Sequence, residues 1–382
     1  MKKKFRILTI ILIVLISLIN NNTTSVSGID KYYFVIAIGL DKNDDDSLKL
    51  SVQIPSNSSN NSQKSSGSSQ SSNYRIYTAQ GKSIDECFTI LNNYLSKKIN
   101  LSHCSALVIS EDLAKEGIRT YFNTLNNNNE LRHSCQIIIS SKTAFDVLDK
   151  VSSSGEVFSS RLFDYLSVSS NYTAYTEKST FGTVFHSIIN DYNELSTIYT
   201  VVSDSNIQTS GIAIFKKDKM VGTIDASDSI FHSMVSNVLN SCTITVDNPF
   251  EENSKIDIKI NLYKKTKINI DIIDGSPLIS IKIFPEGNIL SSGNSFDYSN
   301  SNNIKIVEDA VNSYIQANTK NYLYKITKDY NSDIVGFKGI YKSKFLTEAD
   351  FEKVHWDEIF KDSFYDISVN TLINSSSLFN KE

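Results

Sequence analysis

The chain has 382 residues, of which 40% are hydrophobic and 21% are charged, and its formal net charge at pH 7 is −4. This balance is typical of a globular chain with enough length for two or three domains, and it excludes a disordered protein. A mildly acidic chain does not have the basic charge that is typical of nucleic-acid-binding proteins, so we expect no nucleic-acid partner.

The first residues predict an export signal. Met1 to Arg6 is basic, and Ile7 to Ile19 is almost entirely apolar. This apolar core is shorter than the roughly 20 residues of a comfortable membrane-spanning helix, which favours a signal peptide. Small residues before Gly28 offer a cleavage site. We therefore expect residues 1–27 to be a signal peptide or, as the open alternative, a retained membrane anchor.

Residues 28–150 predict an N-terminal α/β domain. Lys31 to Leu40 and Leu48 to Ile54 are β-rich runs joined by a charged turn, which indicates an antiparallel hairpin. We expect a helix with Ser83 as N-cap and Glu86 at the capping-box position. Two strand–helix units follow and indicate an α/β layer. Their strands are expected at 103–110 and 135–140, and their helices at 111–118 and 143–150.

Two polar stretches lie within this domain. The first holds four aspartates and resembles a calcium loop, but the distal Glu and central Gly of an EF-hand are missing, so we expect a solvated turn. Pro55 to Asn73 is almost entirely Ser, Asn and Gln, so we expect a disordered loop over about 55–73. The four aspartates of the first stretch are Asp41, Asp44, Asp45 and Asp46.

Two His–Cys pairs form the sharpest chemical hypothesis in the chain. His103–Cys104 and His133 with Cys135 each precede an expected strand, so four zinc ligands would converge if these strands were neighbours. A disulfide between Cys104 and Cys135 is a second alternative for an exported protein. We favour a third, in which these are ordinary residues at the start of a strand, and we expect no metal and no cofactor. The other two cysteines are expected in the core: Cys87 and Cys242.

No recognisable catalytic motif is present. His186 lies on an expected helix with no acid or nucleophile at a telling spacing, and His355 is expected to face solvent. The sequence contains no Gly-x-Ser-x-Gly and no His-Glu-x-x-His. We therefore expect no enzyme and assign no catalytic, cofactor-binding or metal-binding residues. An exported hydrolase or small-molecule-binding protein, whose site residues converge only in space, remains the alternative.

The second half of the chain predicts a helical connecting region at 151–200 and a C-terminal domain at 201–376, with a further division near residue 250 left open. Within it, two short apolar runs flank a charged tip and indicate a tight hairpin over Gly211 to Asp225. The expected elements that follow are a helix capped by Ser227, strands at 241–246, 255–265, 267–272 and 278–290, a long helix at 302–330, and a closing strand at 365–373.

The hairpin stretch, Gly211 to Gly222 (GIAIFKKDKMVG), resembles the signature of the Ger(x)C family, the C subunits of germinant receptors, which are lipoproteins of spores. Further matches support the resemblance at AIGLD (37–41), EDLAKEGI (111–118), ELR (130–132), Gly336–Phe337 and Trp356. One departure concerns the lipobox. Family members usually carry a lipidated cysteine after the leader, whereas this chain has no cysteine before Cys87, so lipidation is not possible as written.

The resemblance extends from about Ile29 to Ile373 and implies the fold and the function. It implies an α+β fold of two or three α/β-type domains, each a mostly antiparallel or mixed sheet packed with helices. The implied function is that of a non-enzymatic C subunit of a germinant receptor, needed for assembly and signalling in nutrient-triggered germination. Its partners would be the receptor A and B membrane subunits, at the outer face of the spore inner membrane. No direct small-molecule ligand is expected.

Overall fold

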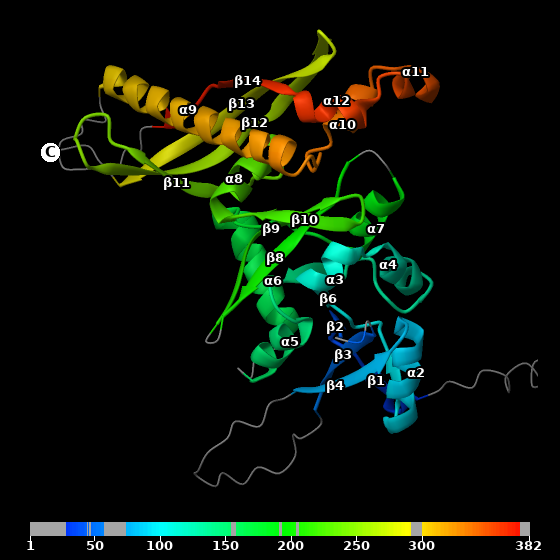
Figure 1. Ribbon diagram of the computed structural model, residues 1–382. Coiled ribbons are helices and arrows are strands. Elements are labelled where there is room, and N and C mark those ends of the chain that lie inside the picture. The colour runs from blue at the N-terminus through cyan, green and yellow to red at the C-terminus, as the bar shows by residue number, and fades with distance from the viewer. Residues whose placement is uncertain are drawn as a thin grey trace, which may run out of the picture.

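The computed structural model describes residues 28–374 except 44, 46, 57–73, 154–157, 191–192, 204–205 and 292–299. The expected signal peptide or anchor and nearly all of the expected loop over about 55–73 therefore lie outside the described residues. Figure 1 shows two sheets stacked along the long axis of the protein. The described chain begins at one end, and the second sheet lies at the other.

The first sheet is mixed and has eight strands. They are β2 (Ala37–Lys42), β3 (Leu48–Pro55), β4 (Tyr74–Gly81), β6 (Ala106–Ser110), β7 (Gln136–Ser140), β8 (Ser196–Val202), β9 (Ile207–Lys216) and β10 (Lys219–Ile224). Their order is β10-β9-β8-β7-β6-β2-β3-β4. The central strands β2, β6, β7 and β8 are parallel, and antiparallel pairs complete both edges. Strands β6 and β7 are buried at every position, as expected where helices cover both faces.

Helices cover both faces of this sheet and confirm the expected α+β class. One face packs against α2 (Ile84–Tyr94), α3 (Glu111–Glu116), α4 (Arg119–Asn126) and α7 (Phe181–Ile189). The opposite face packs against α5 (Ala144–Ser153) and α6 (Phe158–Val168). A separate parallel pair, β1 (Tyr32–Phe34) and β5 (Lys98–Asn100), lies beside α2.

The N-cap of α2 is the one that the sequence predicts. The Ser83 side chain accepts a hydrogen bond from the backbone N–H of Glu86 at 3.2 Å. The Glu86 carboxylate, however, accepts from the N–H of Lys82 at 2.6 Å, one residue before the N-cap. It therefore neutralises the start of the helix without forming the expected capping box.

Asp41 corrects the expectation of a solvated turn. It is the last residue but one of β2 and has an exposed fraction of only 2%. Its carboxylate accepts from the N–H groups of Ala144 at 2.5 Å and Phe145 at 3.0 Å. These donors are the free amides at the start of α5, which a carboxylate satisfies well. Burial raises the pKa of Asp41, and the two N–H donors counteract that rise. The residue therefore fastens α5 to the sheet, a role that depends on a contact about a hundred residues away in sequence.

The second sheet has five strands and is covered on one face. Its strands are β11 (Cys242–Asp247), β12 (Lys255–Ile273), β13 (Ser276–Ser291), β14 (Phe364–Val369) and β15 (Leu372–Asn374). They lie in the order β11-β12-β13-β14, and β15 also pairs with β13. The helices α8 (Ala226–Val235) and α9 (Ser301–Tyr324) pack on the covered face. Three short helices lie at one end: α10 (Phe337–Lys342), α11 (Glu348–Glu352) and α12 (Trp356–Ile359).

Two expectations for this half were wrong in detail. The strands expected at 255–265 and 267–272 are one continuous strand, β12, whose register against β13 shifts between Leu262 and Lys267. Such irregularities bend a strand without ending it. The N-cap of α8 is Asp225, which accepts from the N–H of Asp228 at 2.9 Å, and not Ser227. Both residue types are good caps, and the helix begins at Ala226, two residues earlier than a cap at Ser227 would place it.

The expected hairpin is present as β9 and β10, with Lys217 and Asp218 at the turn. It pairs with β8 and forms an edge of the first sheet, although it lies within the C-terminal domain expected over residues 201–376. The second sheet begins only at Cys242.

Candidate functional site

The β9–β10 hairpin joins the two halves of the protein, because its two faces belong to different hydrophobic cores. Ile212 and Ile214 of β9 lie in the core under the second sheet, whereas Ala213 and Phe215 lie in the core of the first. All four side chains have an exposed fraction of 0%. Successive side chains of a strand point to opposite faces, so a single apolar run can serve both cores.

Two glycines of the hairpin allow close approach, Gly211 by the neighbouring strand β10 and Gly222 by a segment from the second half of the chain. A Cβ at Gly222 would overlap the ring of Tyr330 at Cε1, and the Tyr330 hydroxyl donates to the carbonyl of Thr223 at 3.0 Å. Gly211 has φ +103°, and a Cβ there would lie 2.5 Å from the carbonyl oxygen of Ile224. Tyr330 lies after α9 in the second half of the chain. Its contact with Gly222 of β10 therefore packs that half against the first sheet.

The segment after α9 adds polar contacts to the same junction. The Ser332 hydroxyl donates to the carbonyl of Phe215 at 2.5 Å, and the N–H of Glu194 donates to the carbonyl of Asp333 at 3.0 Å. The Asp333 carboxylate accepts from three N–H groups at the start of α10, those of Gly336, Phe337 and Lys338, at 2.9, 2.9 and 2.7 Å. Burial raises the pKa of Asp333 to about 6, although these three donors act in the opposite direction.

A buried Glu–His–Tyr group connects the halves through side chains. His232 of α8, with an exposed fraction of 2%, places Nδ1 2.6 Å from the hydroxyl of Tyr322 and Nε2 3.3 Å from the carboxylate of Glu177. Burial raises the pKa of Tyr322 well above its ordinary value, so its hydroxyl keeps a proton to donate to Nδ1. Nε2 can then donate to the carboxylate of Glu177. Both ring nitrogens of His232 therefore have a hydrogen-bond partner.

This group has the residue types of a proton relay but not the setting of an active site. Tyr322 is fully buried, and Glu177 lies on the segment between α6 and α7 rather than at an open cleft. A catalytic acid or base must reach a substrate atom directly or through one water. The arrangement therefore fits a structural link between α8, α9 and the first half of the chain.

The structure brings together only part of the hypothetical zinc set. Cys104 and Cys135 are buried with their Sγ atoms 3.9 Å apart, and both are free thiols. The hydrogen bond with the neighbouring Cys104 thiol, together with burial, raises the pKa of Cys135. The His103 ring stacks on Phe34 at 4.6 Å, and the His133 ring lies 6.0 Å from that of Phe181. Within the described ranges, no three His, Cys, Asp or Glu side chains form a group that could hold a metal.

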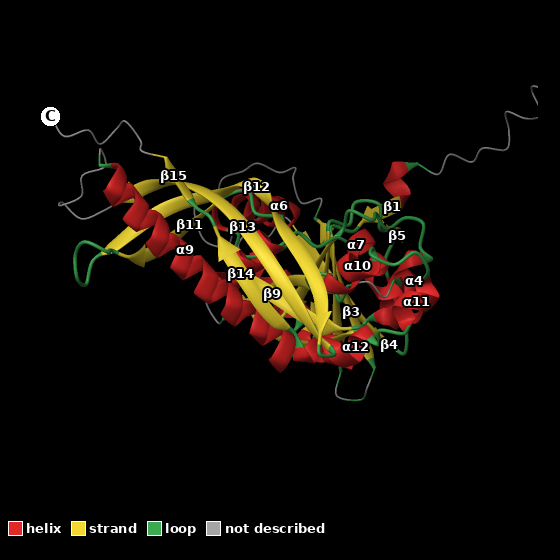
Figure 2. Cartoon of the chain, turned by 90° about the horizontal axis from the view of Figure 1, so that it is seen from above, coloured by secondary structure: helices red, strands yellow, loops and turns green. Residues whose placement is uncertain are grey.

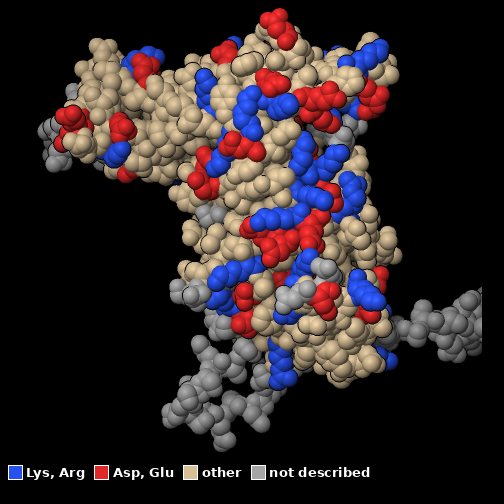
Figure 3. All heavy atoms as spheres, viewed as in Figure 1, with Lys and Arg blue, Asp and Glu red and all other residues tan. Residues whose placement is uncertain are grey.

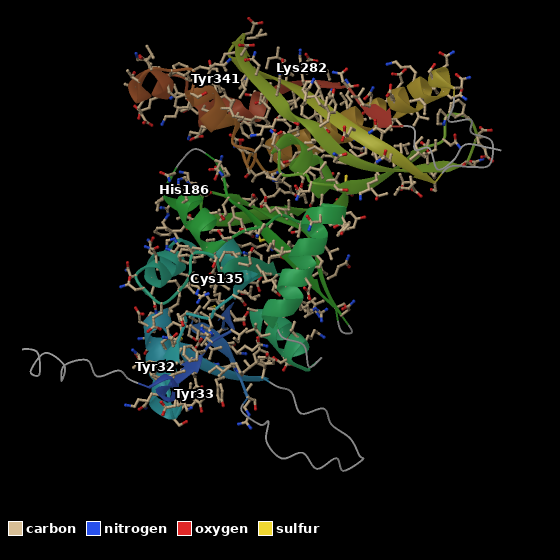
Figure 4. All side chains as sticks on the ribbon, turned by 180° about the vertical axis from the view of Figure 1, so that it is seen from behind. Tyr32, Tyr33, Cys135, His186, Lys282 and Tyr341 are labelled. Atoms are coloured by element: carbon tan, nitrogen blue, oxygen red, sulfur yellow. The ribbon has the colours of Figure 1, made fainter. Side chains whose placement is uncertain are left out.

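Of the other residues that the sequence singled out, the two histidines lie at the surface and the two cysteines lie in the core. His186 and His355 are exposed, and Figure 4 shows His186 at the surface while Cys135 lies inside the first sheet. Cys87 and Cys242 are buried, each with an exposed fraction of 0%.

A cavity of about 280 Å³ opens between α5, α6 and the strands β8 and β9. Its wall combines apolar side chains with Arg161, Tyr165, Tyr175 and the hydroxyls of Thr200 and Thr209. No carboxylate, imidazole or thiol is among its lining residues, so this cavity does not supply a general acid–base pair of the common kinds.

His232, Glu177 and Asp333 were not among the site residues that the sequence predicts. For His232 a signal was present, because Ile230, Phe231, Met234 and Val235 surround it with apolar residues. A histidine in such a setting is buried and needs hydrogen-bond partners. The partners themselves come from distant segments and could not be read from spacing.

These features define a two-sheet α+β protein whose halves are joined by a shared hairpin and buried polar contacts. The description "Spore germination protein N-terminal domain" matches residues 26–202, and "Spore germination B3/ GerAC like, C-terminal" matches residues 210–377. The chain therefore belongs to the GerAC-like, or Ger(x)C, family of spore germination proteins, which confirms the resemblance seen in the sequence.

Curated relatives match most of the chain. The putative spore germination protein YfkR of Bacillus subtilis (strain 168) is 24% identical over 350 residues, covering 86% of both chains. Spore germination protein KC of the same organism is 20% identical and covers 91% of this chain and 90% of its own. Spore germination protein GerQC of Bacillus cereus is 19% identical, with 80% and 83% covered.

A solved structure shares the fold. The crystal structure of the GerBC protein superposes with a TM-score of 0.57 at 16% sequence identity, and covers 88% of this chain and 96% of that chain. None of the helices in the described ranges has the length and hydropathy that crossing a lipid bilayer requires.

Proposed function

We propose that this spore germination protein is a non-enzymatic C subunit of a germinant receptor. In this proposal it assembles with the receptor A and B membrane subunits at the outer face of the spore inner membrane and acts by contact. It contributes to nutrient-triggered germination by stabilising the assembled receptor and transmitting its change of state.

The observation that carries this proposal is the single apolar strand shared by two cores. Because β9 places Ile212 and Ile214 in one core and Phe215 in the other, the halves cannot separate without exposing buried side chains of both. A partner that binds one half is therefore mechanically coupled to the other. A protein that binds only the assembled state stabilises that state by mass action, without bond chemistry.

Deletion of the gene tests the proposal. Spores without the protein are expected to lose their response to nutrient while still germinating with a trigger that does not act through the receptor. They should also contain less of the A and B subunits. Reintroduction of the wild-type gene should restore both. A deletion strain with a normal nutrient response and normal subunit levels would rule the proposal out.

A further inference from the structure

One broad face of the second sheet is not covered by any helix in the described part of the chain. Ile279, Ile281 and Ile283 of β13 point into the core with Val307 and Val311 of α9. The alternate residues of the same strands therefore point away from α9. Figure 2 shows β12, β13 and β14 without a covering helix when viewed from above, and Figure 4 shows Lys282 on the same sheet from behind. We call this surface the open face.

The centre of the open face is positively charged. Lys267 of β12 and Lys282 of β13 are directly opposite each other in the antiparallel register, and both are exposed. Lys264, which is also exposed, lies opposite Phe284 in the neighbouring register position. Neither Lys267 nor Lys282 has an ion-pair partner within the described part of the chain. Like charges directly opposite in a sheet are destabilising, so this pair does not serve the stability of the sheet.

Aromatic and apolar side chains accompany these lysines. Lys264 Nζ lies 5.2 Å from the ring centroid of Tyr263 and 5.8 Å from that of Phe284, and the two rings meet edge to face at 6.0 Å. Further along the same face, Phe364 and Leu372 are 57% and 48% exposed. Exposed aromatic anchors next to cations are typical of surfaces that bind polypeptides.

The acids of this face lie away from the Lys267–Lys282 pair, and most already have partners. Asp247 pairs with Lys255, and Asp257 accepts hydrogen bonds from the hydroxyls of Thr245 and Ser291. Glu286 is hydrogen-bonded by the side-chain amide of Asn261 at 3.1 Å, and Asp366 is exposed on β14. Asp271, nearer the tip, is paired with Lys344 at 3.4 Å. The side of the protein in Figure 3 instead shows lysines and acids intermixed along the junction of the sheets. A basic centre on a chain of net charge −4 is electrostatically complementary to a negatively charged occupant.

We propose that the open face binds an acidic segment of a partner protein in which carboxylates alternate with apolar side chains. The carboxylates would pair with Lys267 and Lys282, and the apolar side chains would contact Phe284 and Phe364. A polypeptide is favoured over an anionic bilayer because the described chain begins at the opposite end of the protein (Figure 1). A membrane that held residues 1–27 would lie at that end. This inference rests on the proposed function in one respect, namely that the occupant of the open face is a protein.

The test compares two matched double charge reversals in the full chain, purified in a neutral detergent. Lys267→Glu with Lys282→Glu alters the open face. Lys31→Glu with Lys98→Glu makes the same change of charge at two exposed lysines in the other half of the protein, one directly before β1 and one on β5. The probe is a fluorescein-labelled peptide of alternating Glu and Leu, followed by fluorescence anisotropy. Vesicles of phosphatidylcholine with phosphatidylglycerol form the second arm.

The wild-type chain is expected to bind the peptide with an affinity that falls as salt is raised. The Lys267/Lys282 reversal should weaken this binding by about tenfold or more, and the Lys31/Lys98 reversal by less than about twofold. Equal loss in both variants, or no peptide binding at all, would overturn the proposal. Vesicle binding that disappears only in the Lys267/Lys282 variant, without peptide binding, would assign the open face to lipid instead. Circular dichroism of both variants checks that they remain folded.

Spores separate this inference from the proposed function. If both are correct, the Lys267/Lys282 variant should show a weaker nutrient response, and the Lys31/Lys98 variant should respond normally. Loss of the response on gene deletion but not in the Lys267/Lys282 variant would refute the docking surface alone. A normal response in the deletion strain would refute the proposed function and leave the peptide measurement to decide on the open face.

Discussion

Substitution of Gly222 by Ala should destabilise the protein through a clash with one particular ring. The new Cβ would overlap Tyr330 at Cε1, Cζ and Cδ1, so the ring must move away from β10. Overpacking of this kind costs about 1–3 kcal/mol. The displaced ring would also lose the hydrogen bond from its hydroxyl to the carbonyl of Thr223, which contributes about 0.5–1.5 kcal/mol.

Removal of the ring should reverse the sign of this effect. In a Tyr330→Ala background the space beside Gly222 is free, and Gly222→Ala then mainly reduces the entropy of the unfolded chain. That change stabilises a protein by about 0.4–1 kcal/mol at a position without strain. The two substitutions should therefore be coupled by about 1.5–4.5 kcal/mol, the sum of the clash and the lost hydrogen bond. Tyr330→Phe is the matched control, because it removes the hydroxyl but keeps the ring and the clash.

Urea unfolding of the wild type, the single variants and the double variants measures this coupling from the free energies of unfolding. If Tyr330 packs on β10, Gly222→Ala should lower the free energy of unfolding when position 330 is Tyr or Phe. It should not lower it when position 330 is Ala. If the penalty is the same in all three backgrounds, Tyr330 does not pack on β10, and the proposed link between the halves is wrong.

Three further predictions concern the core, the pH dependence and the exposed histidines. Phe215→Ala should lower the free energy of unfolding by about 3–5 kcal/mol, because the side chain is fully buried, whereas Leu346→Ala at a fully exposed position should change it by less than about 0.5 kcal/mol in the same urea titration. The pKa of Asp333 is about 6 in the folded state against 3.8 for an ordinary aspartate, so the folded state binds this proton more tightly than the unfolded state. The stability that this group contributes is therefore present below about pH 4 and is lost as the pH rises through about 6, by on the order of 3 kcal/mol. Asp333→Asn should flatten that part of the stability–pH curve, and an unchanged curve would contradict the assignment. His186→Ala and His355→Ala should leave germination intact, since both side chains are exposed; loss of the response with normal fold and partner levels would favour a hidden active site.

Local signals in the sequence predicted the elements that depend on near neighbours. The alternating apolar residues of β9 and β10 and the N-cap at Ser83 are decided within a few residues, and the structure has both. The run of strands and helices between residues 103 and 153 is also decided locally, because each element carries its own hydrophobic period.

The contacts that define the junction depend on long-range packing and could not be predicted in this way. Asp41 was expected in a solvated turn because its neighbours are acidic, yet α5 covers it. His232 has a buried setting that the sequence indicates, but Glu177 and Tyr322 reach it from segments on either side in the chain. The hairpin was expected correctly, whereas its membership of the first sheet depends on pairing with β8.

The central claim is that this protein works by contact within a receptor, and affinity purification from spore membranes tests it most directly. An epitope-tagged chain would be isolated in mild detergent, and the A and B subunits quantified by mass spectrometry. We expect both subunits in comparable amounts with the wild type and with the His186→Ala and His355→Ala variants, and less of both with Gly222→Ala. Absence of both subunits from the wild-type preparation, although the spores require the protein to germinate, would contradict the claim.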